Sequence, residues 1–83
     1  MAELKYEITE KLGTIGENAR GWVRELNMVS WNDREPKYDL RDWSPDHSRM
    51  GKGLTLTVDE VASLRDLLNS LDLDSFDSDE SDV

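Results

Sequence analysis

Residues 22–43, WVRELNMVSWNDREPKYDLRDW, decide the fold of this chain. Residues 22–31 and 37–43 both alternate in the way that strands do, and residues 32–36 between them have the composition of a turn. The segment therefore predicts a β-hairpin. Both faces of its first strand carry apolar side chains, so we expect one face to pack on a core and the other to receive a partner or a ligand.

The segments on either side of the hairpin predict two further strands. Upstream, Leu4, Tyr6 and Ile8 alternate with polar residues and predict a strand. Three glycines between residues 13 and 21 then predict a bend or loop, with the alternative that the strand runs on through Ile15. Downstream, residues 53–57 alternate again and predict a short fourth strand.

A helix is predicted directly after the fourth strand. Thr57 and Glu60 have the spacing of a capping box, in which each side chain bonds the backbone amide of the other residue. Leu64, Leu68 and Leu71 then recur at helical spacing and give one apolar stripe. We expect a helix of about 14 residues that packs over the sheet.

These elements predict an α+β fold, in which a four-stranded curved antiparallel sheet is followed by one C-terminal helix (ββββα). The chain has 83 residues, 36% of them hydrophobic, and no cysteine, so it supplies a lean core and no disulfide. One helix over so small a sheet leaves apolar surface uncovered. We therefore expect a homodimer.

The charge of the chain divides it into a domain, residues 1–71, and an acidic tail, residues 72–83. The tail holds six of the 19 acidic residues and no basic one, so the net charge of -9 falls to -3 over residues 1–71. Its composition predicts disorder. The tail is either a solubilising appendage or a segment that binds a protein partner or folds back on basic residues of the domain.

Several function classes find no support in the sequence. The lone histidine, His47, falls in a predicted loop, and no serine has the G-x-S-x-G setting of a hydrolase, so we expect no enzyme. One imidazole with scattered carboxylates predicts no metal site and no cofactor. The tetrapeptide at 13–16, GTIG, is read as a bend and not as a phosphate-binding loop. The chain has no 18-residue apolar run and no secretory signal, so we expect a cytoplasmic protein that does not enter a membrane.

The hairpin has the composition of a surface that binds single-stranded nucleic acid, because all three tryptophans lie there among arginines and lysines. Bases stack on flat rings while cations follow the phosphates. Trp31 and Trp43 are the predicted platforms, and Trp43 shares its strand face with Lys37 and Arg41. Trp22 falls in register with core positions. Six acids between residues 25 and 46 keep a second class open, a small acidic interaction module or a DNA mimic.

The string at 25–68, ELNMVSWNDREPKYDLRDWSPDHSRMGKGLTLTVDEVASLRDLL, resembles the YdbC-type bacterial branch of the positive-cofactor-four family. Its most specific pieces are VSWN, EPKYDLRDWSPDH and MGKGLTLT, and weaker similarity extends the match to about residues 4–71. The resemblance implies a dimeric ββββα protein of the cytoplasm or nucleoid, from a bacterium or phage. It also implies single-stranded DNA as the ligand, with RNA as a second ligand class, used in transcription or another step of DNA metabolism.

The resemblance also implies roles for individual residues. Arg41 occupies the place of a strand-three arginine that touches the DNA backbone, and Lys52 that of a basic residue ahead of the fourth strand. Trp31 corresponds to an aromatic that stacks a base at the end of strand two. The supporting cations are Lys11, Arg24 and Arg49. The hairpin turn departs from the eukaryotic branch, because it carries acids where that branch is rich in lysine.

Overall fold

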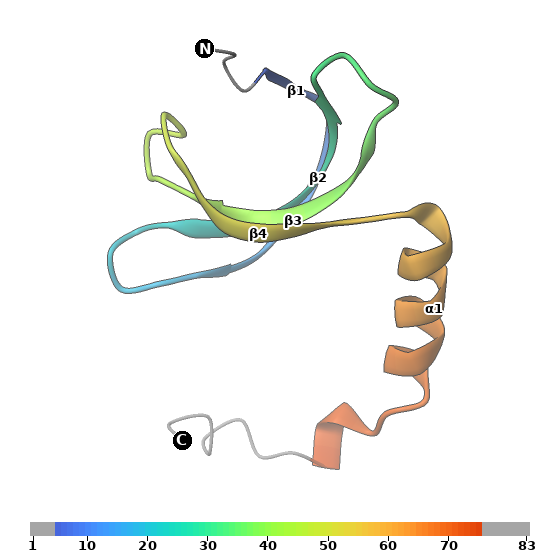
Figure 1. Ribbon diagram of the computed structural model, residues 1–83. Helices are drawn as coiled ribbons and strands as arrows, with labels where there is room; N and C mark the ends of the chain where they lie inside the picture. Colours follow the sequence, from blue (N-terminus) through green and yellow to red (C-terminus); the bar gives the residue numbers. More distant parts are fainter. Residues whose placement is uncertain (1–4, 76–83) are drawn as a thin grey trace.

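The computed structural model describes residues 5–75. Over this range, the strands are β1 (Tyr6–Glu17), β2 (Val23–Trp31), β3 (Lys37–Trp43) and β4 (Met50–Leu56), followed by the helix α1 (Val58–Asn69) and the short 3-10 turn η1 (Leu73–Ser75). The strands form one antiparallel sheet in the order β1-β2-β3-β4. The sheet curves strongly, and α1 leaves it at the end of β4 (Figure 1). The predicted ββββα architecture is confirmed.

The first strand is much longer than the bend signals suggested. β1 continues through Gly13, Ile15 and Gly16, so the predicted bend is wrong over residues 13–17 and the alternative of a continuing strand is right. Three register shifts between β1 and β2 accommodate this segment and bend the strand. The chain turns after Asn18, whose side-chain oxygen accepts two backbone N–H groups of the turn, and Gly21 adopts a φ of 83°.

The start of β4 also lies earlier than predicted, at Met50 and not at residue 53. A register shift opposite Arg41 and Trp43 lets the glycines of residues 51–53 join the strand. Gly53 lies directly across from Arg41, where an added Cβ would come within 2.0 Å of the Arg41 Cβ. Only glycine fits at this position, because any larger residue would keep β4 from pairing with β3 at this distance.

The predicted capping box begins α1 as expected. The Thr57 hydroxyl accepts from the Glu60 amide at 3.1 Å, and the Glu60 carboxylate accepts from the Thr57 amide at 2.9 Å. The helix has 12 residues and ends at Asn69. Part of the segment predicted as a disordered tail, Leu73–Ser75, forms η1, and residues 76–83 lie outside the described residues.

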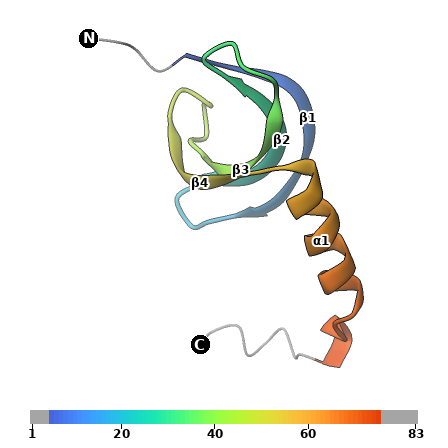
Figure 2. The same cartoon turned by 45° about the vertical axis from the view of Figure 1, so that its right-hand side comes forward.

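The two faces of the sheet differ sharply in burial. Alternation and register place Asn27, Val29, Asp39 and Trp43 on one face, and each of them is at most 1% exposed. Side chains inside a curve crowd together, so this face lines the inside of the curved sheet seen in Figure 2. We call it the concave face; it carries Tyr6, Ile8, Lys11, Glu25, Asn27, Val29, Trp31, Lys37, Asp39, Arg41, Trp43 and Thr55. The opposite, outer face carries Arg24, Leu26, Met28, Tyr38, Leu40, Asp42, Leu54 and Leu56.

The helix does not pack over the sheet as predicted. It extends away from the end of β4, and none of its residues is buried (Figures 1 and 2). Leu64, Leu67, Leu68 and Leu71 remain 40–60% exposed, and Leu54 on the outer face is 50% exposed. A single chain therefore leaves much apolar surface exposed to solvent. α1 is too short and too polar to cross a membrane, and no other helix among residues 5–75 could do so.

Candidate nucleic-acid interface

A row of rings lines the concave face. The Tyr6 ring lies 5.9 Å from that of Trp31 and 5.7 Å from that of Trp43, measured between centroids. Trp43 in turn stacks on His47, with centroids 4.2 Å apart and planes 5° from parallel. We call Trp31, Tyr6, Trp43 and His47 the aromatic row. It joins residues from β1, β2, β3 and the loop after β3, so the curvature of the sheet creates it.

The two predicted platforms differ in access. Trp43 is 1% exposed, and His47 covers one face of its ring. The Trp43 ring therefore packs inside the row and offers no exposed face on which a base could stack. Trp31 is half-buried and lies at the end of β2. Among residues 5–75, the indole Nε1–H groups of these two tryptophans are the buried side-chain donors that lack a hydrogen-bond partner. An unsatisfied buried donor costs about 1–3 kcal/mol, so these two indole groups lower the stability of the single chain.

Arg41 lies over the Trp31 ring, with its Cζ 5.0 Å from the ring centroid. Asp39, two residues earlier on the same face, accepts from its Nε at 2.7 Å and from its Nη2 at 2.8 Å. The Arg41 Nη1 also donates to the Gly51 carbonyl at 3.3 Å. The strand-three arginine is thus present on the concave face beside an aromatic, and its charge is already paired.

The loop after β3 holds His47 against the row. His47 has a φ of 64°, and its Nε2 lies 3.1 Å from the Glu25 carboxylate, which also accepts from the Asn27 amide group. Burial alone would raise the pKa of Glu25, but the hydrogen bonds from His47 and Asn27 outweigh it and hold that pKa below its usual value. Glu25 is therefore ionised at neutral pH, and it anchors the loop to β2.

Asp46 organises the same loop from within. Its carboxylate accepts from the Ser48 hydroxyl at 2.7 Å, the Ser48 amide at 3.0 Å and the Ser44 hydroxyl at 2.9 Å. These bonds, that of the Ser48 hydroxyl above all, lower the pKa of Asp46 to about 2. The hydrogen bonds that hold this loop therefore depend on the ionised form of Asp46.

The predicted cations separate into two groups. Lys11 and Lys37 lie on the concave face, exposed, opposite Asn27 and Val29. Neither forms an ion pair with another residue in the described range 5–75. With Trp31, Arg41 and Trp43, they are the predicted binding residues that lie on the concave face.

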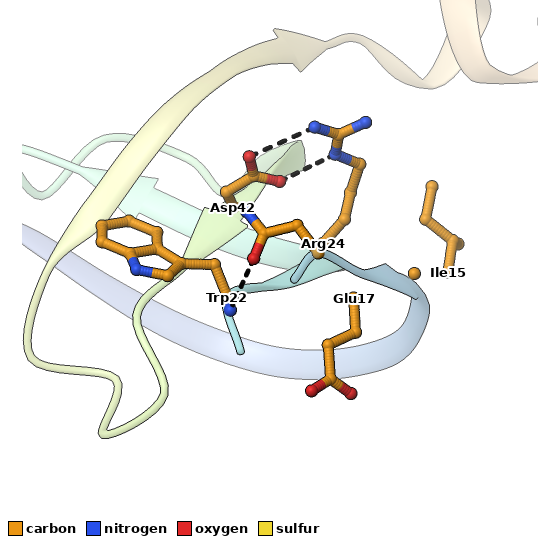
Figure 3. Close-up of a pocket in the computed structure, with 7 residues that line it drawn as sticks. Ile15, Glu17, Trp22, Arg24 and Asp42 are labelled. Atoms are coloured by element: carbon orange, nitrogen blue, oxygen red, sulfur yellow. Dashed lines mark hydrogen bonds and ion pairs between the residues drawn. The ribbon is translucent and has the colours of Figure 1, made fainter. Parts of the chain in front are cut away.

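Arg24 lies on the outer face, where it forms an ion pair with Asp42. Its Nε donates to Asp42 at 2.7 Å and its Nη2 at 3.1 Å (Figure 3). The guanidinium lowers the pKa of Asp42, and the carboxylate raises that of Arg24. The pair borders a pocket of 260 Å³ lined by Ile15, Gly16, Glu17, Asn18, Trp22, Arg24 and Asp42.

Arg49 and Lys52 are also apart from the aromatic row. Arg49 lies 5.8 Å from the ring centroid of Trp22, and Arg20 lies 5.9 Å from the same ring. Lys52 lines a shallow pocket of 320 Å³ together with Arg24, Leu40, Arg41, Gly53 and Leu54. Trp22, predicted as core, is instead half-buried against Gly51 and flanked by arginines.

Three residues of the site were not predicted from the sequence. Tyr6 was recognised as a strand residue, but its position beside Trp31 depends on the curvature. His47 was placed in a loop, and nothing local indicates its stacking on Trp43. Asp39 had a readable signal, because it stands two residues from Arg41 and so shares its strand face.

Comparison with known proteins gives a family and a relative. The family model described as Transcriptional Coactivator p15 (PC4) matches residues 18–67, which is more than half of the chain. A protein of Treponema pallidum (strain Nichols), described as an uncharacterized protein, is 53% identical over 74 residues. The match covers 89% of this chain and 87% of that protein.

Proposed function

Because the chain belongs to the transcriptional coactivator p15 (PC4) family, we propose that it binds single-stranded DNA along the concave face of its sheet. The observation that carries the proposal is the aromatic row with Arg41 at its open end. Bases stack on Trp31 and the groups beside it, and each stacked base contributes about 1–3 kcal/mol. Each of the four bases can stack on an aromatic ring, so we expect little sequence specificity.

The phosphates of the bound strand meet Lys11 and Lys37. Both side chains are exposed on the same face as Trp31, and among residues 5–75 neither forms an ion pair. Lys11 is near enough to Glu25 for its charge to contribute to the lowered pKa of that carboxyl. Arg24, Arg49 and Lys52 lie away from the row, so they serve at most where the strand leaves the concave face. Binding should weaken as salt rises, because each phosphate contact releases counterions.

We further propose that the chain works as a homodimer, with α1 in the interface. An apolar stripe of four leucines, each 40–60% exposed, is large for a chain of 83 residues. A second copy would cover this stripe and leave both concave faces open. A single-stranded DNA-binding dimer in bacterial or phage DNA metabolism is the function that these features support.

The proposal is tested by fluorescence anisotropy of a labelled oligothymidine titrated with the full-length chain at low and moderate salt. Duplex DNA and oligouridine are titrated in parallel, to measure selectivity against duplex and RNA. Tight binding to oligothymidine, with a clear salt dependence and weak duplex binding, supports the proposal. Absence of binding at low salt overturns it.

A second candidate function is an acidic interaction module or DNA mimic, which the net charge of -9 favours. Such a protein would bind cationic partners through the whole domain and would not bind oligothymidine. The same titration separates the two. Removal of residues 72–83 then tests the tail. Unchanged affinity and salt dependence would exclude the role of the tail as a competitor for the concave face.

A further inference from the structure

We infer that Asp39 converts Arg41 from a phosphate-binding cation into a fixed stacking surface over Trp31. Asp39 is then a positioning residue for single-strand binding. The inference rests on the proposed function and assigns its parts: Arg41 and Trp31 contact bases, while Lys11 and Lys37 neutralise phosphates.

The first support is the pairing of charge. Asp39 is 0% exposed and holds Arg41 by two parallel hydrogen bonds of 2.7 and 2.8 Å. Such a fork on a carboxylate is both strong and fixed in direction. The pair is electrically neutral, so Arg41 brings little net attraction to a phosphate. If the guanidinium turned towards a phosphate, it would leave a buried carboxylate without its counter-charge.

The second support is that hydrogen bonds within the protein hold the Arg41 side chain in place. Arginine has five N–H donors, and Arg41 directs three of its nitrogens at partners inside the protein: two at Asp39 and one at the Gly51 carbonyl. Its side chain is only 14% exposed. Asp39 is itself held, because the Thr55 hydroxyl donates to its Oδ2 at 3.3 Å.

The third support is the space made for this arrangement. Gly53 lies directly across from Arg41, and any side chain there would collide with the Arg41 backbone and Cβ. The absence of a side chain at residue 53 lets β4 approach closely and brings the Gly51 carbonyl within reach of Nη1. The guanidinium is thereby placed over Trp31, 5.0 Å from its centroid.

A guanidinium held over an indole offers a base a flat, cationic surface. Bases stack on arginine planes as they do on aromatic rings. The pair Arg41 and Trp31 therefore forms one composite platform, and Asp39 fixes its geometry. Lysine could replace the charge of Arg41 but neither its plane nor its fork.

The deciding experiment compares full-length wild type, Arg41→Lys and Asp39→Asn in oligothymidine anisotropy titrations over a series of salt concentrations. We expect Arg41→Lys to lower affinity about tenfold at every salt concentration, without a change in salt slope, since a stacking surface is lost and the charge is kept. Wild-type affinity in Arg41→Lys would overturn the inference, because Arg41 would then act as a plain cation.

Asp39→Asn tests the positioning role by a readout that loss of stability does not move. Asparagine cannot accept both bonds, so the guanidinium is released with its charge unpaired. We expect a steeper salt slope, by up to about one phosphate contact, together with lower affinity at high salt. A slope equal to that of wild type would contradict the inference. If Asp39→Asn fails to fold by circular dichroism, Arg41→Lys alone decides.

Asp42→Asn is the matched control. It makes the same substitution in the bidentate Arg24–Asp42 pair, which joins β2 to β3 on the outer face. We expect its affinity to stay within about twofold of wild type, because a charge on the far side of the sheet is screened. Failure of wild type itself to bind would overturn the proposed function, whereas wild-type binding with an unaffected Arg41→Lys would overturn only this inference.

Discussion

Trp43 and His47 stack face to face, with ring centroids 4.2 Å apart and planes 5° from parallel. The contact joins the last residue of β3 to a loop residue whose φ is positive. It closes one end of the aromatic row and explains how Trp43 becomes buried without a helix over the sheet. The concave face therefore depends on the loop at 44–49 for part of its shape.

The first prediction concerns the acid sensitivity of this loop. The folded pKa of Asp46, about 2, lies below its ordinary value of 3.8, so its ionised form stabilises the loop above pH 3.8 and this contribution is lost as pH falls towards 2. We expect the His47 ring to leave Trp43 in that window. The ring-current shifts of the His47 protons, followed by NMR, measure the change.

Asp46→Asn is the control, because it removes the titrating group and keeps the size. We expect this variant to show a loosened His47 already at neutral pH and a smaller change in acid than wild type. Glu25 faces His47 and also has a lowered pKa, so the difference between the two proteins isolates Asp46. Identical titration curves would contradict the assignment.

The second prediction concerns Trp31. Trp31→Ala should weaken oligothymidine binding by about 1–3 kcal/mol, because one base loses its stacking surface. Trp31→Phe should recover part of the loss. Trp22→Phe, on the outer side, is the control and should bind like wild type. Equal affinities for Trp31→Ala and wild type, with the fold intact by circular dichroism, would exclude Trp31 as a platform.

Local sequence patterns predicted the elements of this fold because each depends on neighbours in the chain. Alternation gives the strands, and the bonds between Thr57 and Glu60 give the start of the helix. The bend predicted at Gly13 and Gly16 was wrong because bulges in pairing with β2 absorb these glycines, and such pairing is not a local property.

The site was harder to predict for the same reason. Strand parity placed Lys37, Arg41 and Trp43 on one face correctly, but parity does not tell which ring is reachable. Trp43 is buried by Tyr6 and His47, residues far from it or beyond a turn, and only the curvature brings them together. The pairing of Arg41 with Asp39 was visible in the spacing, whereas its place over Trp31 was not.

The third prediction concerns the phosphate contacts. Lys11→Gln and Lys37→Gln should each lower the salt slope of oligothymidine binding by about 0.7, the value for one contact on a single strand. Affinity should fall for all base compositions alike. Lys5→Gln is the control: Lys5 is also exposed, but it is paired with Asp33 at 2.9 Å. A slope unchanged in all three variants would remove Lys11 and Lys37 from the site.

The fourth prediction concerns assembly. Leu67 is 60% exposed in the apolar stripe of α1, so Leu67→Lys would place a charge inside the proposed dimer interface. We expect this variant to sediment as a monomer at concentrations where wild type sediments as a dimer, because burying an unpaired ammonium is costly. Analytical ultracentrifugation measures the difference.

The control for this prediction introduces the same residue on another face of the helix. Asp66 lies about 100° around the axis from Leu67, on the side away from Leu64 and Leu71. Asp66→Lys should therefore remain dimeric, with the loss of only an exposed ion pair to Arg65. If both variants stay dimeric, or if wild type is monomeric throughout, α1 is not the interface, and the leucines must be covered by another partner.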